Sequence, residues 1–296
     1  MTSAPVVLDI RSPEIVDLLG ADLRLETLAD GLTFTEGPVW KADEACLFFT
    51  DIVGDRILRW QAQAGVTVLR APSHMANGLA LDHSGRLIIC EHATSRVTRL
   101  DGHGHVEVLA AQYDGMALNS PNDVIVARDG SLYFTDPLYG REAQWGVPRT
   151  AEMGFRGVYR INGASGALTL LADDFVAPNG LCLSADERLL FVNDSETGTI
   201  RRFPVASDGT LAAGVAWAKL EAVGPGSPDG MKLDRFGNLF CCGPGGIHVL
   251  APDARCLGII RMPEFAANLC FGGRALDELF ITATTSLYRI RLETGG

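Results

Sequence analysis

Six polar residues with side-chain oxygens recur along the chain, each followed directly by a short apolar run. They are Glu36, Asn77, Asn122, Asn179, Asp229 and Asn268. Carboxylate and amide oxygens are the ligands that hard divalent cations such as Ca²⁺ and Mg²⁺ prefer. Two carboxylates would partly neutralise such an ion, and amides would complete its shell. If the fold brings these residues together, they predict a metal site with positions open to water or a substrate.

Each of these residues also has a purely structural explanation, because Asn and Asp at strand starts commonly form turns with nearby backbone. Glu36 is the exception, since Glu is a poor turn former and the sequence Glu36-Gly37-Pro38 imposes a tight start on its strand. Asn77 and Asn268 lie in the least distinctive contexts, and we interpret them as lining of a channel. The predicted metal ligands are therefore Glu36, Asn122, Asn179 and Asp229.

The six residues open six copies of one unit, at intervals of 41, 45, 57, 50 and 39 residues. Each interval has room for four short strands, which is the composition of a propeller blade. We therefore predict an all-β fold, a six-bladed β-propeller with four-stranded blades. Its first strands line a central channel, so the six polar residues meet at one end of that channel. An irregular β-sandwich is the alternative.

The sixth unit stops after SLYRIRLETGG without an outer strand, and residues 23–28 (LRLETL) match that strand in pattern. We expect this N-terminal strand to complete the last blade, which closes the ring and leaves no open sheet edge. Residues 1–22 are predicted to form an arm with a short helix, with Ser12 as N-cap, Pro13 as first residue and Gly20 as its end. The whole chain, 1–296, is thus predicted to be one propeller domain.

A second set of acidic residues lies at the ends of the second strands: Asp51, Glu91, Asp136 and Asp194. These strand ends reach the same face as the predicted metal site. We expect the four side chains to cap loops or to orient ligands rather than to bind a metal directly. His92, which follows Glu91, either lines the pocket or belongs to a solvated loop.

The connection at residues 138–157, between the second and third strands of the third unit, is far longer than a hairpin requires. Long ordered loops in compact domains are commonly lids or binding loops. This loop should emerge on the face of the metal site. We predict that it forms a lid and that Tyr139, Trp145 and Arg149 contact a substrate. Packing on the rim or against another subunit is the alternative.

The bulk composition restricts the partners. With 25 Lys and Arg against 36 Asp and Glu, the net charge of −11 argues against nucleic acid. No apolar run approaches the roughly 20 residues that span a bilayer, and the first residues do not resemble a signal peptide. The seven Cys lie mostly in apolar runs and are expected to be reduced thiols. We predict a cytoplasmic protein without nucleic-acid or membrane partners, monomeric or weakly homo-oligomeric.

Motifs for other chemistries do not occur in the sequence. It contains no Gly-x-Ser-x-Gly nucleophile elbow and no glycine-rich phosphate loop that opens a helix. Metal-assisted hydrolysis is the chemistry that the residues support. The all-oxygen set favours one divalent cation, with Ca²⁺ first, Mg²⁺, Mn²⁺ and Fe²⁺ as alternatives, and Zn²⁺ less well matched.

Five motifs carry a family resemblance over essentially the whole chain. They are Thr35-Glu-Gly-Pro-Val-Trp, Ser120-Pro-Asn-Asp, Phe134-Thr-Asp-Pro, Pro178-Asn-Gly-Leu with Ser184-Ala-Asp-Glu, and Ser227-Pro-Asp-Gly. In this order they resemble the SMP-30/gluconolactonase family of calcium-dependent lactonases. The resemblance implies metal ligands at Glu36, Asn179 and Asp229, Asn122 as a ligand or substrate contact, and Asp229 as catalytic acid/base. It also implies a lactone substrate, in particular a sugar lactone.

The chain departs from the family pattern at one position. Members similar to the animal protein carry an Arg two residues before the Asn equivalent to Asn122, and here that residue is Ser120. The Arg contact to sugar hydroxyls is therefore missing. We include Ser120 among the predicted substrate-binding residues and expect the loop side chains to compensate for the Arg.

The resulting hypothesis is a hydrolase in which the metal polarises a lactone carbonyl and Asp229 deprotonates the attacking water. Two alternatives stay open. One is an organophosphate or aryl-ester hydrolase, because related propellers use a similar Glu, Asn, Asn, Asp set around calcium. The other is a non-catalytic propeller in which the metal is structural and the same face binds a partner.

Overall fold

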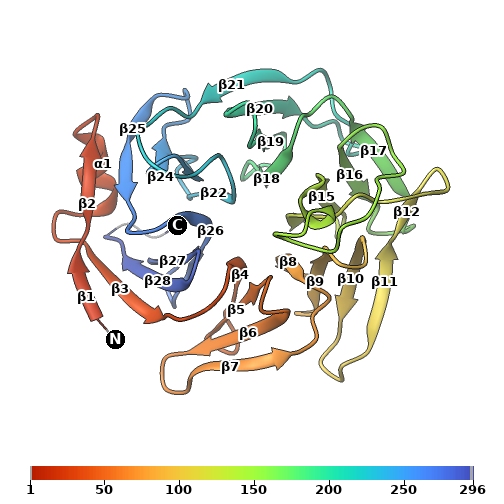
Figure 1. The fold of residues 1–296 in the computed structure, drawn as a ribbon. Coiled ribbons are helices and arrows are strands. Elements are labelled where there is room, and N and C mark those ends of the chain that lie inside the picture. Colours follow the sequence, from red (N-terminus) through yellow and green to blue (C-terminus); the bar gives the residue numbers. More distant parts are fainter. Residues whose placement is uncertain (1, 294–295) are drawn as a thin grey trace.

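Six antiparallel sheets surround a central channel in the computed structural model, which describes residues 2–293 and residue 296 (Figure 1). The first three blades run from the channel to the rim in chain order. Blade one contains β4 (Thr35–Lys41), β5 (Cys46–Asp51), β6 (Arg56–Gln61) and β7 (Gly65–Arg70). Blade two contains β8 (Ala76–Leu81), β9 (Leu87–Glu91), β10 (Arg96–Leu100) and β11 (Val106–Ala110). Blade three contains β14 (Val124–Val126), β15 (Leu132–Asp136), β16 (Gly157–Ile161) and β17 (Leu168–Ala172).

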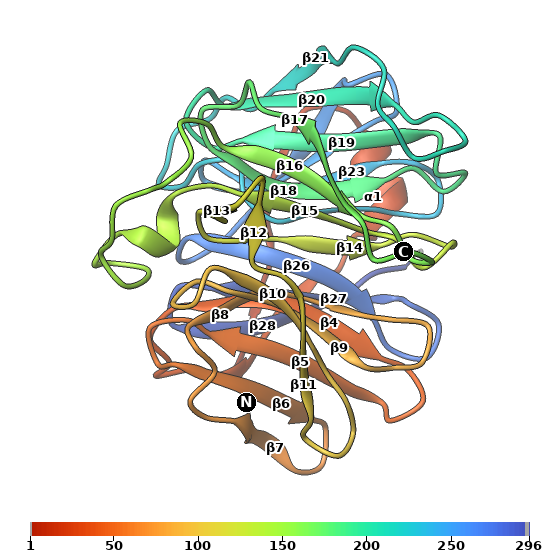
Figure 2. The same cartoon turned by 90° about the vertical axis from the view of Figure 1, so that its right-hand side faces the viewer.

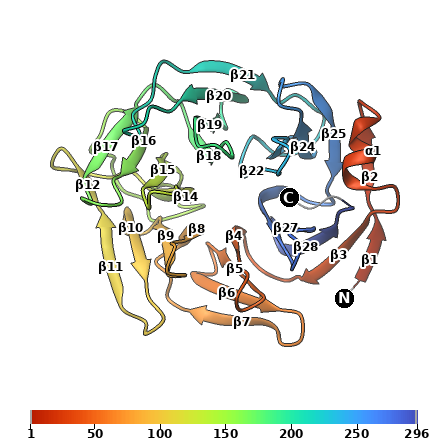
Figure 3. The same ribbon diagram turned by 180° about the vertical axis from the view of Figure 1, so that it is seen from behind.

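The remaining three blades continue the ring with the same strand order. Blade four contains β18 (Pro178–Leu183), β19 (Leu189–Asp194), β20 (Thr199–Pro204) and β21 (Val215–Lys219). Blade five contains β22 (Met231–Leu233), β23 (Leu239–Gly243), β24 (Gly246–Leu250) and β25 (Cys256–Arg261). Blade six contains β26 (Ala266–Gly272), β27 (Glu278–Ala283) and β28 (Ser286–Arg291). Viewed from behind in Figure 3, the first strands again border the channel.

The N-terminal strand closes the ring, as the sequence predicted. β3 (Arg24–Ala29) pairs antiparallel with β28 and supplies the fourth strand of blade six. The arm before it also adds two strands that the sequence analysis did not predict. β1 (Thr2–Pro5) pairs with β3, and β2 (Val7–Ile10) pairs with β25 of blade five. Strands of four largely exposed residues, such as TSAP, carry no alternating apolar pattern from which they could be recognised.

The predicted helix is α1 (Glu14–Leu19), and it ends at Gly20 with a positive φ of 105°. Its N-cap position is Pro13 rather than the predicted Ser12, whose hydroxyl bonds instead to the Glu14 carboxylate at 3.4 Å. Ile15 and Leu19 are fully buried and join the core of blades five and six. The arm is therefore packed onto the ring through two apolar side chains. No helix in the described part of the chain is long and apolar enough to cross a membrane.

The hydrophobic core is divided among the spaces between neighbouring blades. One cluster joins Tyr133 and Val158 of blade three to Leu190 and Val192 of blade four. Second strands such as β5 are buried throughout, whereas the outer strand β7 is largely exposed. Both faces of each inner strand are covered by adjacent blades, so burial there is continuous rather than alternating. This packing gives the ring a stiff frame on which the first strands are held.

Two irregular segments depart from the blade pattern. A small hairpin of β12 (Gln112–Tyr113) and β13 (Met116–Ala117) precedes blade three. The long connection between β15 and β16 contains the 3-10 helix η1 (Tyr139–Arg141) and projects from one face of the ring (Figure 2).

Candidate metal and active site

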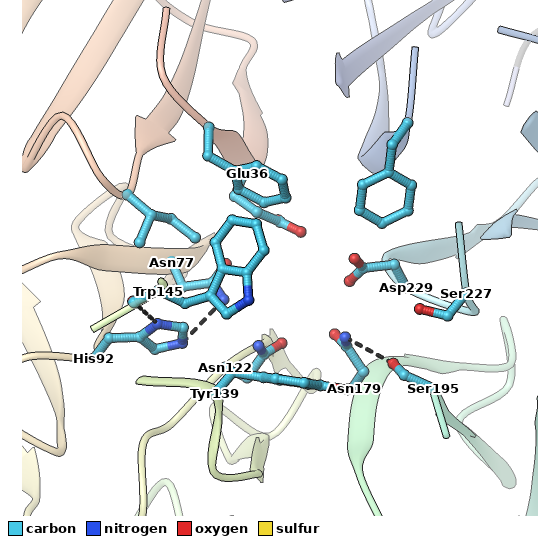
Figure 4. Close-up of a pocket in the computed structure, with 13 residues that line it drawn as sticks. Glu36, Asn77, His92, Asn122, Tyr139, Trp145, Asn179, Ser195, Ser227 and Asp229 are labelled. Carbon is cyan, nitrogen blue, oxygen red and sulfur yellow. Dashed lines mark hydrogen bonds between the residues drawn. The ribbon is translucent and has the colours of Figure 1, made fainter. Parts of the chain in front are cut away.

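A pocket lies at one end of the central channel, on the face from which the long loop projects (Figure 4). Five of the six polar residues that open the repeats line it. The full lining is Phe34, Glu36, Ile52, Asn77, His92, Asn122, Tyr139, Trp145, Asn179, Ser195, Ser227, Asp229 and Phe265. Figure 4 shows Glu36, Asn122, Asn179 and Asp229 pointing toward one another. The structure thus brings the four predicted metal ligands together.

Two local features turn these side chains toward the axis. The pairing register of the first strand shifts at Glu36, Asn77, Asn179 and Asn268, which are positions of β-bulges or similar irregularities. Bulges re-aim a side chain and are common beside active sites. A glycine also follows several of these residues. A Cβ at Gly37 or Gly180 would collide with the carbonyl oxygen of the polar residue that opens the next blade, so glycine lets the first strands approach closely.

Glu36 is buried, with an exposed fraction of 3%. Its Oε2 accepts hydrogen bonds from the Gly37 backbone N–H at 2.6 Å and from the Asn268 amide at 2.8 Å. Burial raises the pKa of Glu36 above its ordinary value, and these two hydrogen bonds lower it only in part. Asn268, which the sequence analysis treated as channel lining, therefore holds one carboxylate oxygen in place.

Asp229 faces Glu36 across the pocket. Burial raises the pKa of Asp229 well above its usual range, and the nearby carboxylates of Glu36 and Asp123 raise it further. No Lys or Arg is among the thirteen residues that line the pocket. Two buried carboxylates that repel one another are expensive to ionise, so the site favours either bound protons or a bound cation.

Ser195 fixes the orientation of the Asn179 amide. The Ser195 hydroxyl donates its single hydrogen to the Pro228 carbonyl at 2.6 Å and accepts a hydrogen bond from Asn179 Nδ2 at 3.0 Å. Because the hydroxyl has no second hydrogen to donate, the Asn179 oxygen must face the pocket. The same Ser195 contact ties down the backbone directly before Asp229.

The donor chemistry fits a divalent cation. Within the described residues no cluster of three or more His, Cys, Asp or Glu side chains is arranged to hold a metal. The pocket combines two carboxylates with amide oxygens instead, and such a set suits a hard cation better than Zn²⁺. The unneutralised pair of Glu36 and Asp229 is the feature that a cation would stabilise most.

Part of the pocket lining is apolar. Phe34 packs against Trp145 with ring centroids 4.2 Å apart and against Phe265 at 6.1 Å. Ile52 belongs to the same cluster. The pocket therefore combines side-chain oxygens with aromatic surface, a combination typical of small-molecule sites.

The loop at 138–157 brings Tyr139 and Trp145 to the pocket. Arg149 of the same loop and Ser120, which precedes β14, do not line it. The Arg149 guanidinium is occupied by the carbonyls of Gly140, Val147 and His92 and by the Ser95 hydroxyl. The Ser120 hydroxyl donates to the Pro137 carbonyl at 2.6 Å and accepts from the Gly140 N–H. In this structure both side chains hold the loop rather than line the pocket. Burial raises the pKa of Tyr139 to about 12, so its hydroxyl stays protonated.

The second ring of acidic residues organises loops, as expected. Asp51 accepts hydrogen bonds from the Phe34 N–H at 2.9 Å and from Arg56 at 2.8 Å. Asp136 binds the N–H groups of Asn119 and Ser120. Glu91 pairs with Arg96 at 2.6 Å, and Asp194 caps the N–H groups of residues 176, 196 and 197. These contacts hold the four side chains in their loops, and none of the four lines the pocket.

Several pocket residues were missed or left open by the sequence analysis. Ile52, His92 and Ser195 each follow directly after a member of the second ring, namely Asp51, Glu91 and Asp194. The position after each second-strand end is therefore a signal that could have identified them. Phe34 and Phe265 lie in the segments that lead into first strands, where the repeat offers no comparable pattern.

Comparisons with known proteins identify the family of the chain. A family model described as SMP-30/Gluconolactonase/LRE-like region matches residues 34–285. The chain belongs to this family. A gluconolactonase from Zymomonas mobilis subsp. mobilis is 32% identical to the chain, covering 96% of this chain and 86% of the relative.

Further family relatives include a solved structure. A gluconolactonase from Xanthomonas campestris superposes with a TM-score of 0.89 at 36% identity, covering 99% of this chain and 98% of that chain. A pentonolactonase from Haloferax volcanii is 26% identical, covering 83% of this chain and 80% of the relative.

Proposed function

We propose that this protein is a metal-dependent lactonase that opens the ester ring of a sugar lactone. The observation that carries the proposal is the buried pair of Glu36 and Asp229, which face one another in a pocket without a lining Lys or Arg. The names of the relatives support the substrate class, since two are gluconolactonases and one is a pentonolactonase.

A divalent cation would be held by Glu36, Asn122, Asn179 and Asp229, with Ca²⁺ the first choice for an all-oxygen set. When bound, it supplies Lewis acidity toward the ester carbonyl and stabilises the oxyanion that forms there. A nearby positive charge also lowers the pKa of Asp229, which lets this carboxyl act as a base near neutral pH.

The side chains of the pocket then have separate roles in hydrolysis. A carboxylate oxygen of Asp229 takes a proton from the attacking water as the water oxygen bonds to the carbonyl carbon. When the ring C–O bond breaks, Asp229 returns this proton to the leaving ring oxygen, so the product is a hydroxy acid. Phe34 and Trp145 cover the non-reacting face of the ring and exclude bulk water.

The aromatic wall also favours a second candidate activity, the hydrolysis of aryl esters. Phe34, Trp145 and Phe265 offer a surface on which an aromatic leaving group would pack. The same carboxylate and cation would serve that reaction, so the two activities differ only in which substrate fills the apolar side.

A substrate panel tests both candidates. Chelated protein is assayed by acid release with aldonolactones, unsubstituted lactones and aryl esters, before and after addition of Ca²⁺, Mg²⁺ or Mn²⁺. We expect sugar lactones to be turned over fastest and only with a cation present. The exposed-site variant Asp253→Asn serves as a matched control and should behave as the unaltered protein. A cation that raises the melting temperature without any turnover would replace the proposal with a structural metal.

A further inference from the structure

His92 occupies an unusual position for a histidine of this pocket. It follows the last residue of β9, is 1% exposed, and has one partner on each ring nitrogen. Nδ1 lies 2.9 Å from the Trp145 carbonyl oxygen, and Nε2 lies 3.1 Å from Asn77 Nδ2 (Figure 4). His92 therefore connects the loop at 138–157 to one of the six residues that open the blades.

These partners determine the protonation of the ring. A carbonyl oxygen only accepts hydrogen bonds, so Nδ1 must carry a hydrogen. Burial lowers the pKa of His92 to about 4, which keeps the ring neutral at pH 7. A neutral imidazole with hydrogen on Nδ1 has a lone pair on Nε2. Asn77 must therefore donate from Nδ2, and its oxygen Oδ1 is left for the pocket that it lines.

The loop that carries the Trp145 carbonyl is held against blade two. Arg149 donates to the His92 carbonyl and, at 2.6 Å, to the Ser95 hydroxyl, which fixes the loop against blade two. Gly140 packs so closely on the His92 side chain that a Cβ there would collide with it. The position of the loop and the orientation of the Asn77 amide consequently depend on each other.

We propose that His92 is a positioning residue that makes Asn77 a hydrogen-bond acceptor, and that Asn77 Oδ1 binds a hydroxyl group of the substrate. The inference rests on the proposed function for the identity of the ligand, a hydroxyl-bearing lactone. Asn77 is uncharged and stands beside the apolar wall of Trp145, where a neutral hydroxyl donor fits. This acceptor supplies a sugar contact in a chain that has Ser120 in place of the family's Arg.

Kinetics with a matched pair of lactones test the substrate half of the inference. δ-Gluconolactone and δ-valerolactone share a six-membered lactone ring, but only the first carries hydroxyl groups. In Asn77→Ala and in His92→Leu we expect the preference for gluconolactone, measured as a ratio of kcat/KM, to fall about tenfold, mostly through KM. His92→Gln, which restores an acceptor near the Nε2 position, should recover most of the preference.

The double variant separates positioning from independent contributions. If His92 acts through Asn77, the change in preference for Asn77→Ala with His92→Leu equals that for Asn77→Ala alone. If the losses of preference in the two single variants add up in the double variant, His92 does not act through Asn77. His83→Leu is the matched control, because His83 contacts the Ala127 carbonyl outside the pocket and should leave the preference unchanged. If Asn77→Ala weakens Ca²⁺ binding tenfold and leaves the preference intact, Asn77 is a metal ligand and the substrate role is wrong.

The tautomer is tested without any substrate. In protein labelled with ¹⁵N-histidine, the His92 signals are assigned by their loss in His92→Gln. At pH 7 we expect the neutral form of His92 with hydrogen on Nδ1. Either the opposite tautomer or an imidazolium would show that His92 does not orient the Asn77 amide in this way. If no lactone is hydrolysed, the proposed function fails together with the substrate role of Asn77, whereas the orientation by His92 is still decided by this spectrum.

Discussion

Two rings of acidic side chains lie at the same end of the propeller, and they differ in what their oxygens contact. In the outer ring, Asp51 and Glu91 are fully buried and bonded to arginines, while Asp136 and Asp194 hold backbone N–H groups. In the inner ring, Glu36 and Asp229 face a pocket and one another. A carboxylate with all its oxygens satisfied supports structure. A buried carboxylate to which no arginine or lysine is bonded is available for a cation or a proton.

This contrast gives opposite expectations for the same substitution in the two rings. Replacing an inner carboxylate removes chemistry and relieves repulsion, so activity should fall while the metal-free fold keeps its stability. Replacing an outer carboxylate removes hydrogen bonds on which loops depend, so stability should fall first.

The largest effect is expected for Asp229→Asn. Loss of the proton acceptor should lower kcat by about 10²–10⁴-fold, because the amide cannot take a proton from water. The metal-free variant should melt at the same temperature as the unaltered protein or higher, since one of two repelling buried carboxylates is gone. Lactone turnover measures the loss of activity, and thermal melting measures the stability of the metal-free variant. Near-full turnover with cation still bound would show that Asp229 is not the base.

In the outer ring, Asp51→Asn should cost stability. The substitution breaks a buried carboxylate contact with Arg56 and weakens the hold on the Phe34 N–H, and we expect a loss of about 2–3 kcal/mol in the free energy of unfolding. Denaturant unfolding measures it. The matched control Asp253→Asn removes an exposed ion pair with Arg255 and should leave the stability essentially unchanged. Equal effects of the two variants would contradict the assignment of Asp51.

Asp136 should make stability depend on pH. Burial raises the pKa of Asp136 from 3.8 to about 7 in the folded state. Between these values the folded protein holds a proton on Asp136 that the unfolded chain has released, so the contribution of Asp136 to stability is largest below about pH 4 and declines as the pH rises to about 7. The pKa difference of about 3.2 (about 7 minus 3.8) sets an upper bound of about 4 kcal/mol on this contribution to the free energy of unfolding. We expect a contribution of about 1–3 kcal/mol.

The comparison of the unaltered protein with Asp136→Asn isolates this contribution, because the amide does not titrate. Unfolding measured from pH 4 to pH 8 should show a gap between the two proteins that changes in this window. A gap that stays constant across the range would mean that Asp136 titrates alike in folded and unfolded states.

The smallest effect is expected for Ser195→Ala. Without the hydroxyl, the Asn179 amide is free to turn its nitrogen toward the pocket, and Ca²⁺ affinity should weaken about tenfold. Calorimetric titration with Ca²⁺ measures this. Ser195→Thr keeps the hydroxyl and should bind Ca²⁺ as the unaltered protein does. Unchanged affinity in Ser195→Ala would show that Asn179 needs no such support.

The fold was predictable because the same sequence pattern recurs in each blade. Each blade restates the same sequence of polar start, apolar strand and turn, so the six copies reinforced one another, and the N-terminal strand β3 was recognised as the missing part of the sixth. The added strands β1 and β2 occur once each, are short, and are largely exposed. No repetition or alternation marked them, and only their pairing with existing sheet edges creates them.

The pocket was predictable where residues shared a repeat position, and the length of the loop at 138–157 also indicated Tyr139 and Trp145. Glu36, Asn122, Asn179 and Asp229 converge because they begin equivalent strands. Arg149 illustrates the limit, since a loop arginine near a site reads as a substrate contact, whereas here its donors are taken by carbonyls and the Ser95 hydroxyl. Which donor meets which acceptor inside an irregular loop depends on its three-dimensional path, and sequence spacing does not record that path.

The seam between blades six and one has a consequence for biosynthesis. Asn268 holds Glu36 across 232 residues of sequence, and Arg289 bonds Glu26 across 263. A ribosome-bound chain that has not yet produced blade six lacks the side chain that fixes Glu36, and its β3 lacks β28, its partner within that blade. Contacts of such long range form late and slowly. If the pocket binds a cation as proposed, it would therefore do so only after the two ends of the chain have met.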